Sequence, residues 1–581
     1  MEGEHTLFIP PLDAGYPEAS DSLKLFLDRA HAALGDALIS SIDEAAMRDV
    51  CRQLDGLPLA IELAVPLLRV FSAEELAGRL SRPLDYLSAG RHSAELRHGS
   101  LQRAIEWSYR LLTEAEARLF AALGVFAGGF TLAAVEHVWG GCSHEAELPV
   151  LLRSLIEKSL VLEQGTSAGG GKRFVLLESV RQYAEACARE RNVLAKLNVR
   201  RGDYFDAFVR AQAVQLHGAS EEQALALLDE EHANIELMLS SIARQGEVER
   251  GLELAELLHW YWYRRARFSR GEYWLSLFLE GQGDARTPLR ARGTRALAWM
   301  LFIRGAWRRA YSAYAESLYV SRQCGDAHCE AWSLAGVGVT ARWMGDVERG
   351  TEYTEEAVRV ARATGDPYLL LHTLIWAYAT TGGSFTGEPP VARLQEAADV
   401  ARRVGSRWSY AHVLNGLADL FSELGSYEQA ESDYLLALHE FEGLGDRWML
   451  AWTEEGLGLL SVRQEDLPRA AAHTARAVAR FHELGDELNL AVVLVRLADV
   501  HEALGQPAAA ARFAGAASTV MDWLANSDLA RSPRIEAARE RCAGYERTMP
   551  LAWAAGRDAP RHRVVEEAQA VELSEGAASA G

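Results

Sequence analysis

Apolar and small side chains recur at the spacing of an α-helix throughout the second half of the chain. In the stretch SYAHVLNGLADLFSELG they fall three or four residues apart, at Ala411, Leu414, Leu417, Ala418 and Phe421. The following stretch, YEQAESDYLLALHEFEGLG, has the same spacing. A repeat of three to four residues places such side chains on one face of a helix. The pattern therefore predicts a succession of amphipathic helices joined by short turns.

The turns between these segments repeat with a period of forty residues. One series of glycines lies at Gly325, Gly365, Gly405, Gly445 and Gly485, and a second series lies midway, at Gly305, Gly345, Gly425 and Gly505. Two slots of the second series, near residues 385 and 465, keep turn residues without the glycine in register. Glycine ends a helix without steric cost in the left-handed conformation, so each period predicts a helix hairpin. Stacked hairpins form an α-solenoid, and this one resembles tetratricopeptide repeats over residues 266–525.

Aromatic residues concentrate in and just before this array. Arrays that resemble tetratricopeptide repeats bind peptides, proteins or small effectors on their concave face. The candidate partner or effector surface comprises Trp260, Trp262, Tyr263, Arg264, Trp299, Trp332, Trp376, Trp408 and Trp452. Packing between helices is the favoured alternative, because aromatic side chains at helical spacing usually fill cores.

The first half of the chain predicts helices followed by a hairpin. Thr113 and Glu116 form a capping box, and Thr131 caps a further helix after a Gly-Gly turn. The segment ELPVLLRSLIEKS is helical in pattern, whereas SLVLE and RFVLLE alternate like two strands around a glycine-rich loop. Three helices followed by a hairpin predict a winged-helix arrangement.

Four sequence elements occur in a distinctive order. They are GLPLA, RHGSLQRAIEWSYRLL, LFAALGVFAGGFTL and LLESVRQYA. In this order they resemble the helical and winged-helix parts of bacterial STAND-class (NB-ARC-like) signal-transduction ATPases, the regulators of AfsR and LuxR type. The resemblance implies a P-loop domain that binds ATP or ADP and a repeat array that senses an inducer. It also implies a fused or separate DNA-binding domain that acts on transcription.

The nucleotide-binding motifs that the resemblance implies are absent from this sequence. The segment GTSAGGGKR has Thr166 where a P-loop has its first glycine, and Arg173 where it has a hydroxyl. The segment ALALLDEE imitates a Walker B strand but continues with helical spacing. Leu176, Leu177 and Glu178 replace the Met-His-Asp triplet of many relatives. We therefore expect no cofactor, and ATP or ADP only if a P-loop domain lies upstream.

The GLPLA element comprises Gly56, Leu57, Pro58, Leu59 and Ala60. In the family that it resembles, the proline packs beside the nucleotide base. Without a nucleotide pocket we interpret the element as vestigial. Proline is favoured in the first turn of a helix, where its missing N–H needs no partner, and this role is predicted for Pro58.

The charge of the chain argues against nucleic acid as its main partner. The formal net charge is −21, whereas nucleic-acid affinity depends on Lys and Arg that neutralise phosphates. Lys172 and Arg173 at the predicted wing are the candidate phosphate contacts, and a solvated hairpin end is the favoured alternative. We expect no direct DNA binding, and no membrane span, metal site or catalytic constellation is recognisable in the sequence. A cytoplasmic protein that is not an enzyme is predicted.

The sequence thus predicts a mainly α protein with five parts. Residues 1–95 are a remnant of a nucleotide-binding module and 96–195 a winged helix. Residues 196–265 form a helical connector, 266–525 the solenoid, and 526–581 a C-terminal cap and tail. The expected function is that of a regulatory interaction module that binds an inducer or a partner protein, with oligomerisation left open. The alternative is a truncated ATP-dependent DNA-binding regulator whose P-loop domain lies upstream.

Overall fold

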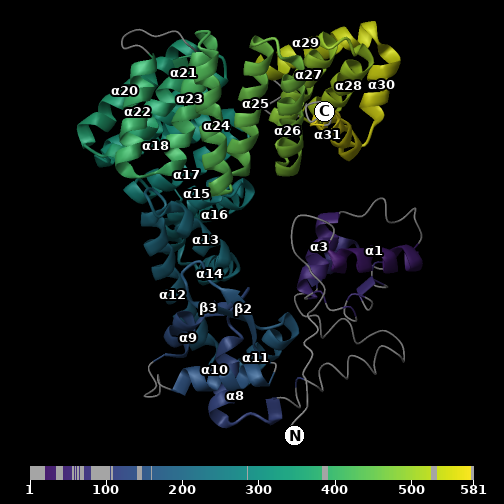
Figure 1. Cartoon of the computed structure of the whole chain (residues 1–581). Coiled ribbons are helices and arrows are strands. Elements are labelled where there is room, and N and C mark those ends of the chain that lie inside the picture. Colours follow the sequence, from purple (N-terminus) through teal and green to yellow (C-terminus); the bar gives the residue numbers. More distant parts are fainter. Residues whose placement is uncertain are drawn as a thin grey trace. The chain divides into compact units, whose positions relative to one another are not determined.

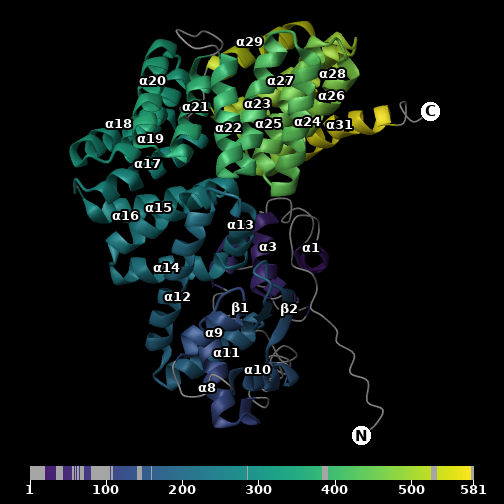
Figure 2. The same ribbon diagram turned by 60° about the vertical axis from the view of Figure 1, so that its left-hand side comes forward.

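The computed structural model describes most of the chain and divides it into two compact units. The described residues are 20–34, 44–54, 71–79, 109–140, 147–158, 160–283, 285–381, 390–524 and 533–576, with single positions 56, 58, 61, 64, 65, 68 and 105. One unit comprises Met1–Phe208 and Asp229–Met238, and the other comprises Val209–Leu228 and Leu239–Gly581. Helices dominate both units (Figures 1 and 2), which confirms the predicted mainly α class.

The first unit begins with three helices around a small apolar cluster. They are α1 (Asp21–Leu34), α3 (Glu44–Gln53) and α5 (Ala73–Arg79). Gly56 has a φ of 63° and donates its N–H to the Cys51 carbonyl at 3.1 Å, so it ends α3 in the left-handed conformation. Pro58 is helical and exposed. The remaining GLPLA residues, Leu57, Leu59 and Ala60, lie outside the described residues.

A three-stranded sheet with helices completes this unit. The elements are α8 (Glu114–Leu123), β1 (Phe130–Thr131), α9 (Leu132–Trp139), α10 (Leu148–Glu157), β2 (Leu162–Thr166), β3 (Lys172–Val175) and α11 (Glu178–Glu190). The strands pair antiparallel in the order β1-β3-β2, with Phe130 opposite Phe174. The glycine-rich loop joins β2 to β3, as the alternating pattern predicts.

Local side-chain chemistry sets the ends of these helices. Thr113 accepts from the Glu116 N–H at 3.4 Å and caps α8, while the Glu116 carboxylate accepts from the Thr113 N–H at 2.6 Å. Thr131 likewise accepts from the Ala134 N–H at 3.3 Å and caps α9. The buried Glu116 also binds Lys158 at 2.6 Å. Burial opposes its ionisation, but the bonds from Lys158, Ser154 and Thr113 lower its pKa to about 2.

Three helices link the sheet region to the hairpin series: α12 (Leu194–Gln215), α13 (Glu221–Glu230) and α14 (His232–Gln245). The segment ALALLDEE is part of α13 and its end, which agrees with its interpretation as a helix rather than a Walker B strand. Seven helix pairs follow in sequence. They are α15 (Val248–Arg264) with α16 (Phe268–Gln282), α17 (Pro288–Ile303) with α18 (Trp307–Cys324), α19 (Ala327–Trp343) with α20 (Val347–Thr364), α21 (Pro367–Thr381) with α22 (Pro390–Val404), α23 (Arg407–Glu423) with α24 (Tyr427–Leu444), α25 (Arg447–Arg463) with α26 (Leu467–Leu484), and α27 (Glu487–Ala503) with α28 (Pro507–Trp523).

The glycine-aspartate turns explain the period. Gly325 closes α18 with a φ of 69°, and Asp326 accepts from the Cys329 N–H at 2.9 Å to cap α19. The glycine thus provides the C-cap of one helix, and the aspartate side chain accepts a backbone N–H at the start of the next. Near residue 465, where glycine is missing, Glu465 itself adopts the left-handed conformation, with a φ of 62°.

Small residues let the two helices of a hairpin approach closely. A Cβ on Gly338 would lie 2.6 Å from Thr354 Cγ2, and one on Gly458 would lie 2.7 Å from Thr474 Oγ1. These contacts join α19 to α20 and α25 to α26, so any larger side chain there forces the helices apart.

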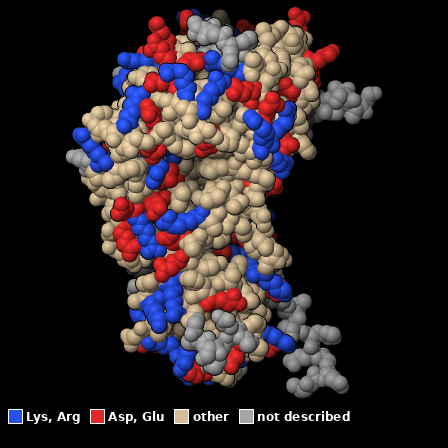
Figure 3. Space-filling view, turned by 90° about the vertical axis from the view of Figure 1, so that its left-hand side faces the viewer, with Lys and Arg blue, Asp and Glu red and all other residues tan. Residues whose placement is uncertain are grey.

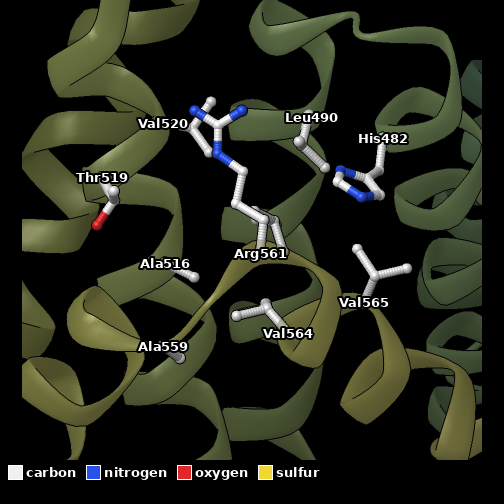
Figure 4. A pocket seen from close by; sticks show the side chains of 10 residues that line it. His482, Leu490, Ala516, Thr519, Val520, Ala559, Arg561, Val564 and Val565 are labelled. Atoms are coloured by element: carbon white, nitrogen blue, oxygen red, sulfur yellow. The ribbon is translucent and has the colours of Figure 1, made fainter. Parts of the chain in front are cut away.

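The C-terminal helices α29 (Pro533–Thr548), α30 (Pro550–Asp558) and α31 (Arg561–Gly576) close the end of the array. A Cβ on Gly515 of α28 would lie only 2.0 Å from the Trp553 carbonyl of α30, so these backbones touch. Between α31 and its neighbours a cavity of about 20 Å³ remains (Figure 4), with Val564 and Leu490 among its walls. A cavity of this size holds about one water molecule.

The left-handed turns give a direct stability test. Gly485 has a φ of 67° and open space around the position of a Cβ, so Gly485→Ala introduces backbone strain alone. We expect a loss of about 1 kcal/mol in unfolding free energy, measured by urea titration. Glu465→Gly relieves the same strain and is expected to stabilise the protein by up to about 1 kcal/mol. Equal stability of wild type and Gly485→Ala would contradict this account.

Candidate functional site

A groove of about 520 Å³ lies in the described part of the second unit. Its walls come mainly from the first helices of successive hairpins, α17, α19, α21, α23 and α25. On α23 the lining side chains include His412, Asn415, Asp419 and Glu423, which follow one another at three or four residues. On α25 the same spacing gives Trp448, Trp452, Glu455, Leu459 and Arg463. The groove is thus lined by one face of each helix.

Aromatic rings form a continuous wall along the groove. The Trp299 ring stacks on that of Trp376 with centroids 4.7 Å apart, and Tyr263 meets Trp299 edge-on at 5.0 Å. Trp448 and Trp452 of α25 meet at 5.8 Å. Offset and edge-to-face pairs of this kind are favourable, so the rings of the wall stabilise one another.

Arginines form another part of the lining. Two of them form ion pairs with the carboxylate of Glu455. The Arg534 guanidinium lies over Trp343 at 5.5 Å and over Trp452 at 5.3 Å, and it is 3.4 Å from Glu455. Arg496 pairs with the same Glu455 carboxylate. Burial lowers the pKa of Arg534, while Glu455 works in the opposite direction.

Carboxylates dominate a third part of the lining. Asp419 opens onto the groove and accepts a hydrogen bond from the Tyr434 hydroxyl. The surrounding protein atoms raise the pKa of Asp419 to about 6, although the Tyr434 hydrogen bond opposes this, and Glu455 and Glu423 raise it further. In the described part of the chain, the side-chain carboxylate of Glu423 accepts no hydrogen bond and forms no ion pair.

The residues that the sequence predicts as a candidate partner or effector surface fall into two groups in the structure. Tyr263, Trp299, Trp376 and Trp452 line the groove. The others are buried and lie outside its lining, namely Trp260, Trp262, Arg264, Trp332 and Trp408. Their burial is compatible with packing between helices, the alternative that the sequence favoured.

Arg264 belongs to a buried charge network. Its guanidinium lies 3.5 Å from both Glu221 and Asp446 and 4.9 Å from the centre of the Trp408 ring. Glu221, the first residue of α13, accepts from the Trp408 N–H at 2.7 Å. Asp446 accepts from the Trp408 indole N–H at 2.7 Å. This network fastens the start of α13 to α15, α23 and the turn before α25.

The charged groove residues were missed by sequence reasoning. Taken one at a time, these residues have the pattern of ordinary charges on the surface of helices. They are Asp419, Glu423, Glu455, Arg496 and Arg534. The signal in the sequence that could have found them is their position within the forty-residue repeat. Asn415 and Glu455 lie forty residues apart, as do Glu423 and Arg463, so each pair occupies equivalent positions of the repeat.

The predicted wing residues lie in different environments. Lys172 is exposed and pairs with Glu163 at 2.8 Å. Arg173 is 6% exposed, pairs with Glu231 and donates to the Gly128 carbonyl at 3.0 Å. The sequence predicts that Arg173 is exposed at the end of a hairpin. The structure differs, because Arg173 is buried in the first unit and paired with Glu231. Leu177 is the N-cap position of α11, and its neighbour Glu178 binds Arg181.

The charge pattern of the surface gives no extended basic face in the view of Figure 3, where Lys and Arg alternate with Asp and Glu over the solenoid. Among the residues that the structure covers, no helix is both long and apolar enough to cross a membrane. Within the same residues, no group of three His, Cys, Asp or Glu side chains is placed to hold a metal ion.

Comparison with known sequences identifies relatives in mycobacteria. The chain is 31% identical over 425 residues to a Mycobacterium tuberculosis protein with the provisional name of an HTH-type transcriptional regulator. That match covers 71% of this chain and 47% of the relative. An uncharacterised protein of the same organism is 33% identical over 186 residues, covering 32% of this chain and 46% of its own length. The chain therefore spans about half the length of the curated relatives it matches. No protein-family model matches the chain.

Comparison with solved structures finds helical-repeat proteins. One is a Signal Transduction ATPase with Numerous Domains from Pyrococcus horikoshii with a tetratricopeptide repeat sensor. It has a TM-score of 0.40 and 13% identity, and the match covers 96% of this chain and 74% of that one. Another is a Rap protein complexed with competence and sporulation factor. Its TM-score is 0.39 with 12% identity, over 60% of this chain and 99% of that one.

The raised pKa of Asp419 predicts a pH-dependent stability. A carboxyl that ionises less readily in the folded state destabilises that state at alkaline pH. This cost disappears as the pH falls through about 6 towards the usual value of 3.8. Asp419→Asn keeps an acceptor for Tyr434, so we expect it to be more stable than wild type at pH 8 and equal to it near pH 4 in urea titrations. A constant difference across this range would contradict the assignment.

Proposed function

We propose that the chain is a regulatory interaction module of a bacterial signal-transduction or transcriptional regulator. Its solenoid senses an inducer or a partner protein, and the chain alone does not hydrolyse ATP. The observation that carries the proposal is the groove of about 520 Å³, whose aromatic and charged side chains come from successive hairpins. Pockets of this size and mixed lining are typical of ligand sites.

The first unit supports the same interpretation. Its order of helix, strand, two helices and hairpin supports the winged helix that we propose for it. The buried pair of Arg173 with Glu231 ties this element to the segment Asp229–Met238 within the same unit. In the proposed mechanism it transmits contacts between domains, as the resemblance to STAND-class regulators implies. The mycobacterial relatives named as transcriptional regulators agree with that role.

A second candidate function is that of an ATP-dependent DNA-binding regulator of which this chain is a part. The observation that favours it is length, because the match covers 47% of the longer mycobacterial relative. An in-frame P-loop in the DNA upstream of Met1 would support this candidate. A stop codon before any such motif would support the first.

The proposed role of the groove in sensing is tested by a substitution that fills it with a larger side chain. Leu459 lines the groove on α25 and is 37% exposed, whereas Val462 on the same helix is 40% exposed and lies outside the lining. We expect Leu459→Trp to reproduce the transcript changes caused by deleting the gene in the source bacterium, measured by RNA sequencing. Val462→Trp, which adds the same bulk, should behave as wild type. Wild-type transcript levels in both variants would argue against sensing through the groove.

The absence of nucleotide chemistry is tested by calorimetry. The segment that imitates a P-loop is the turn between β2 and β3, and a leucine, Leu177, stands at the start of α11. The first has Thr166 in place of a P-loop glycine and Arg173 in place of the hydroxyl residue that binds magnesium, and the second replaces a histidine of many relatives. Titration of the purified chain with ATP or ADP should therefore give no saturable heat. Micromolar affinity for either nucleotide would contradict the proposal.

A further inference from the structure

The charges that line the groove are unevenly balanced. Glu455 is matched by Arg496 and Arg534, and Arg463 donates to the Ser422 hydroxyl at 2.5 Å. Asp419 accepts from the Tyr434 hydroxyl, which is neutral. Glu423 has neither a hydrogen bond nor an ion pair among the described residues. The groove thus presents two carboxylates that lack a directly bonded cation.

These two carboxylates repel each other. Asp419 and Glu423 are four residues apart on α23, the spacing that places like charges side by side on a helix. Glu455 of α25 adds to this repulsion at Asp419, although it is itself paired with Arg496 and Arg534, and Arg463 opposes it. A cation placed between the carboxylates would relieve it. The net charge of −21 attracts cations to the protein as a whole.

The walls nearby suit an organic cation rather than a metal ion. Tyr378 and Tyr434 line the groove with Asp419, and the stacked rings of Trp299 and Trp376 line the same groove. The faces of aromatic rings carry partial negative charge and attract ammonium groups. A metal ion would require a closer set of oxygen or nitrogen ligands than these rings provide.

We propose, building on the proposed function, that the groove binds a small organic amine with an aromatic or aliphatic body. Its ammonium group lies between Asp419 and Glu423, and its body lies against Trp299, Trp376 and Trp452. The volume of about 520 Å³ admits such a molecule. An anionic ligand fits less well, because Arg534 is covered by two indole rings and already paired with Glu455.

Two probes of the same shape and opposite charge test this proposal. Tryptamine carries an ammonium group, and 3-(indol-3-yl)propionate carries a carboxylate in its place. In calorimetric titrations of the full chain at pH 8, tryptamine should bind with a Kd below about 1 mM, whereas indolepropionate should give no saturable binding. At pH 5 the affinity for tryptamine should fall about tenfold, because Asp419 takes up a proton near pH 6.

Matched variants locate the ammonium group. Asp419→Asn and Glu423→Gln should each weaken tryptamine binding by about tenfold, the usual loss when a charged partner of a hydrogen bond is removed. Glu442→Gln changes an exposed carboxylate of α24 outside the groove and should leave the affinity unchanged. Circular dichroism at 25 °C confirms that each variant is folded.

Three results would overturn the amine proposal. They are the absence of saturable tryptamine binding, tighter binding of indolepropionate, or an affinity that Asp419→Asn leaves unchanged. None of them affects the transcript experiment with Leu459→Trp, which tests regulation through the groove without assuming any ligand. Loss of regulation in that variant together with tight binding of indolepropionate would keep the proposed function and reject the amine.

Discussion

A left-handed glycine followed by a side chain that caps the next helix is the constraint on which the solenoid depends. Because the turn at Gly325 and Asp326 recurs every forty residues, the helices of successive hairpins have nearly equal lengths. Equal lengths return the same face of each first helix to the same position in the array. The groove is a product of this regularity, since Asn415 on α23 and Glu455 on α25 occupy equivalent repeat positions and both line it.

The repeat was predictable from the sequence because its determinants are local. Glycine and aspartate act within a few residues of their own position, so the turns, the caps at Thr113 and Thr131 and the β2–β3 hairpin follow from short motifs. The groove depends on which helix face meets the concave side, and periodicity alone does not determine this. Trp262 packs against Gly271 while Trp299 lines the groove, although both occur in similar helical patterns. Arg173 was misplaced because its partner Glu231 is distant in sequence.

The buried network around Arg264 connects the groove to the helices that precede the solenoid. Arg264 and its neighbour Tyr263 lie on α15, where Tyr263 contacts the aromatic wall and Arg264 lies between Glu221 and Asp446. Removing Arg264 would leave the buried carboxylates of Glu221 and Asp446 without their shared cation, which is costly in a protein interior. The start of α13 is therefore held by the same helix that forms part of the groove wall. A displacement of α15 would therefore move both the groove wall and the start of α13.

The position of Arg534 between Trp343 and Trp452 has a consequence for the timing of assembly. These tryptophans leave the ribosome well before the arginine that covers them, because α19 and α25 precede α29 in the chain. Until α29 has been synthesised and has docked, two indole faces and the Glu455 carboxylate lack one of their partners. A nascent or prematurely ended chain would present an unfinished groove, because the groove is complete only when α29 has been translated and has docked.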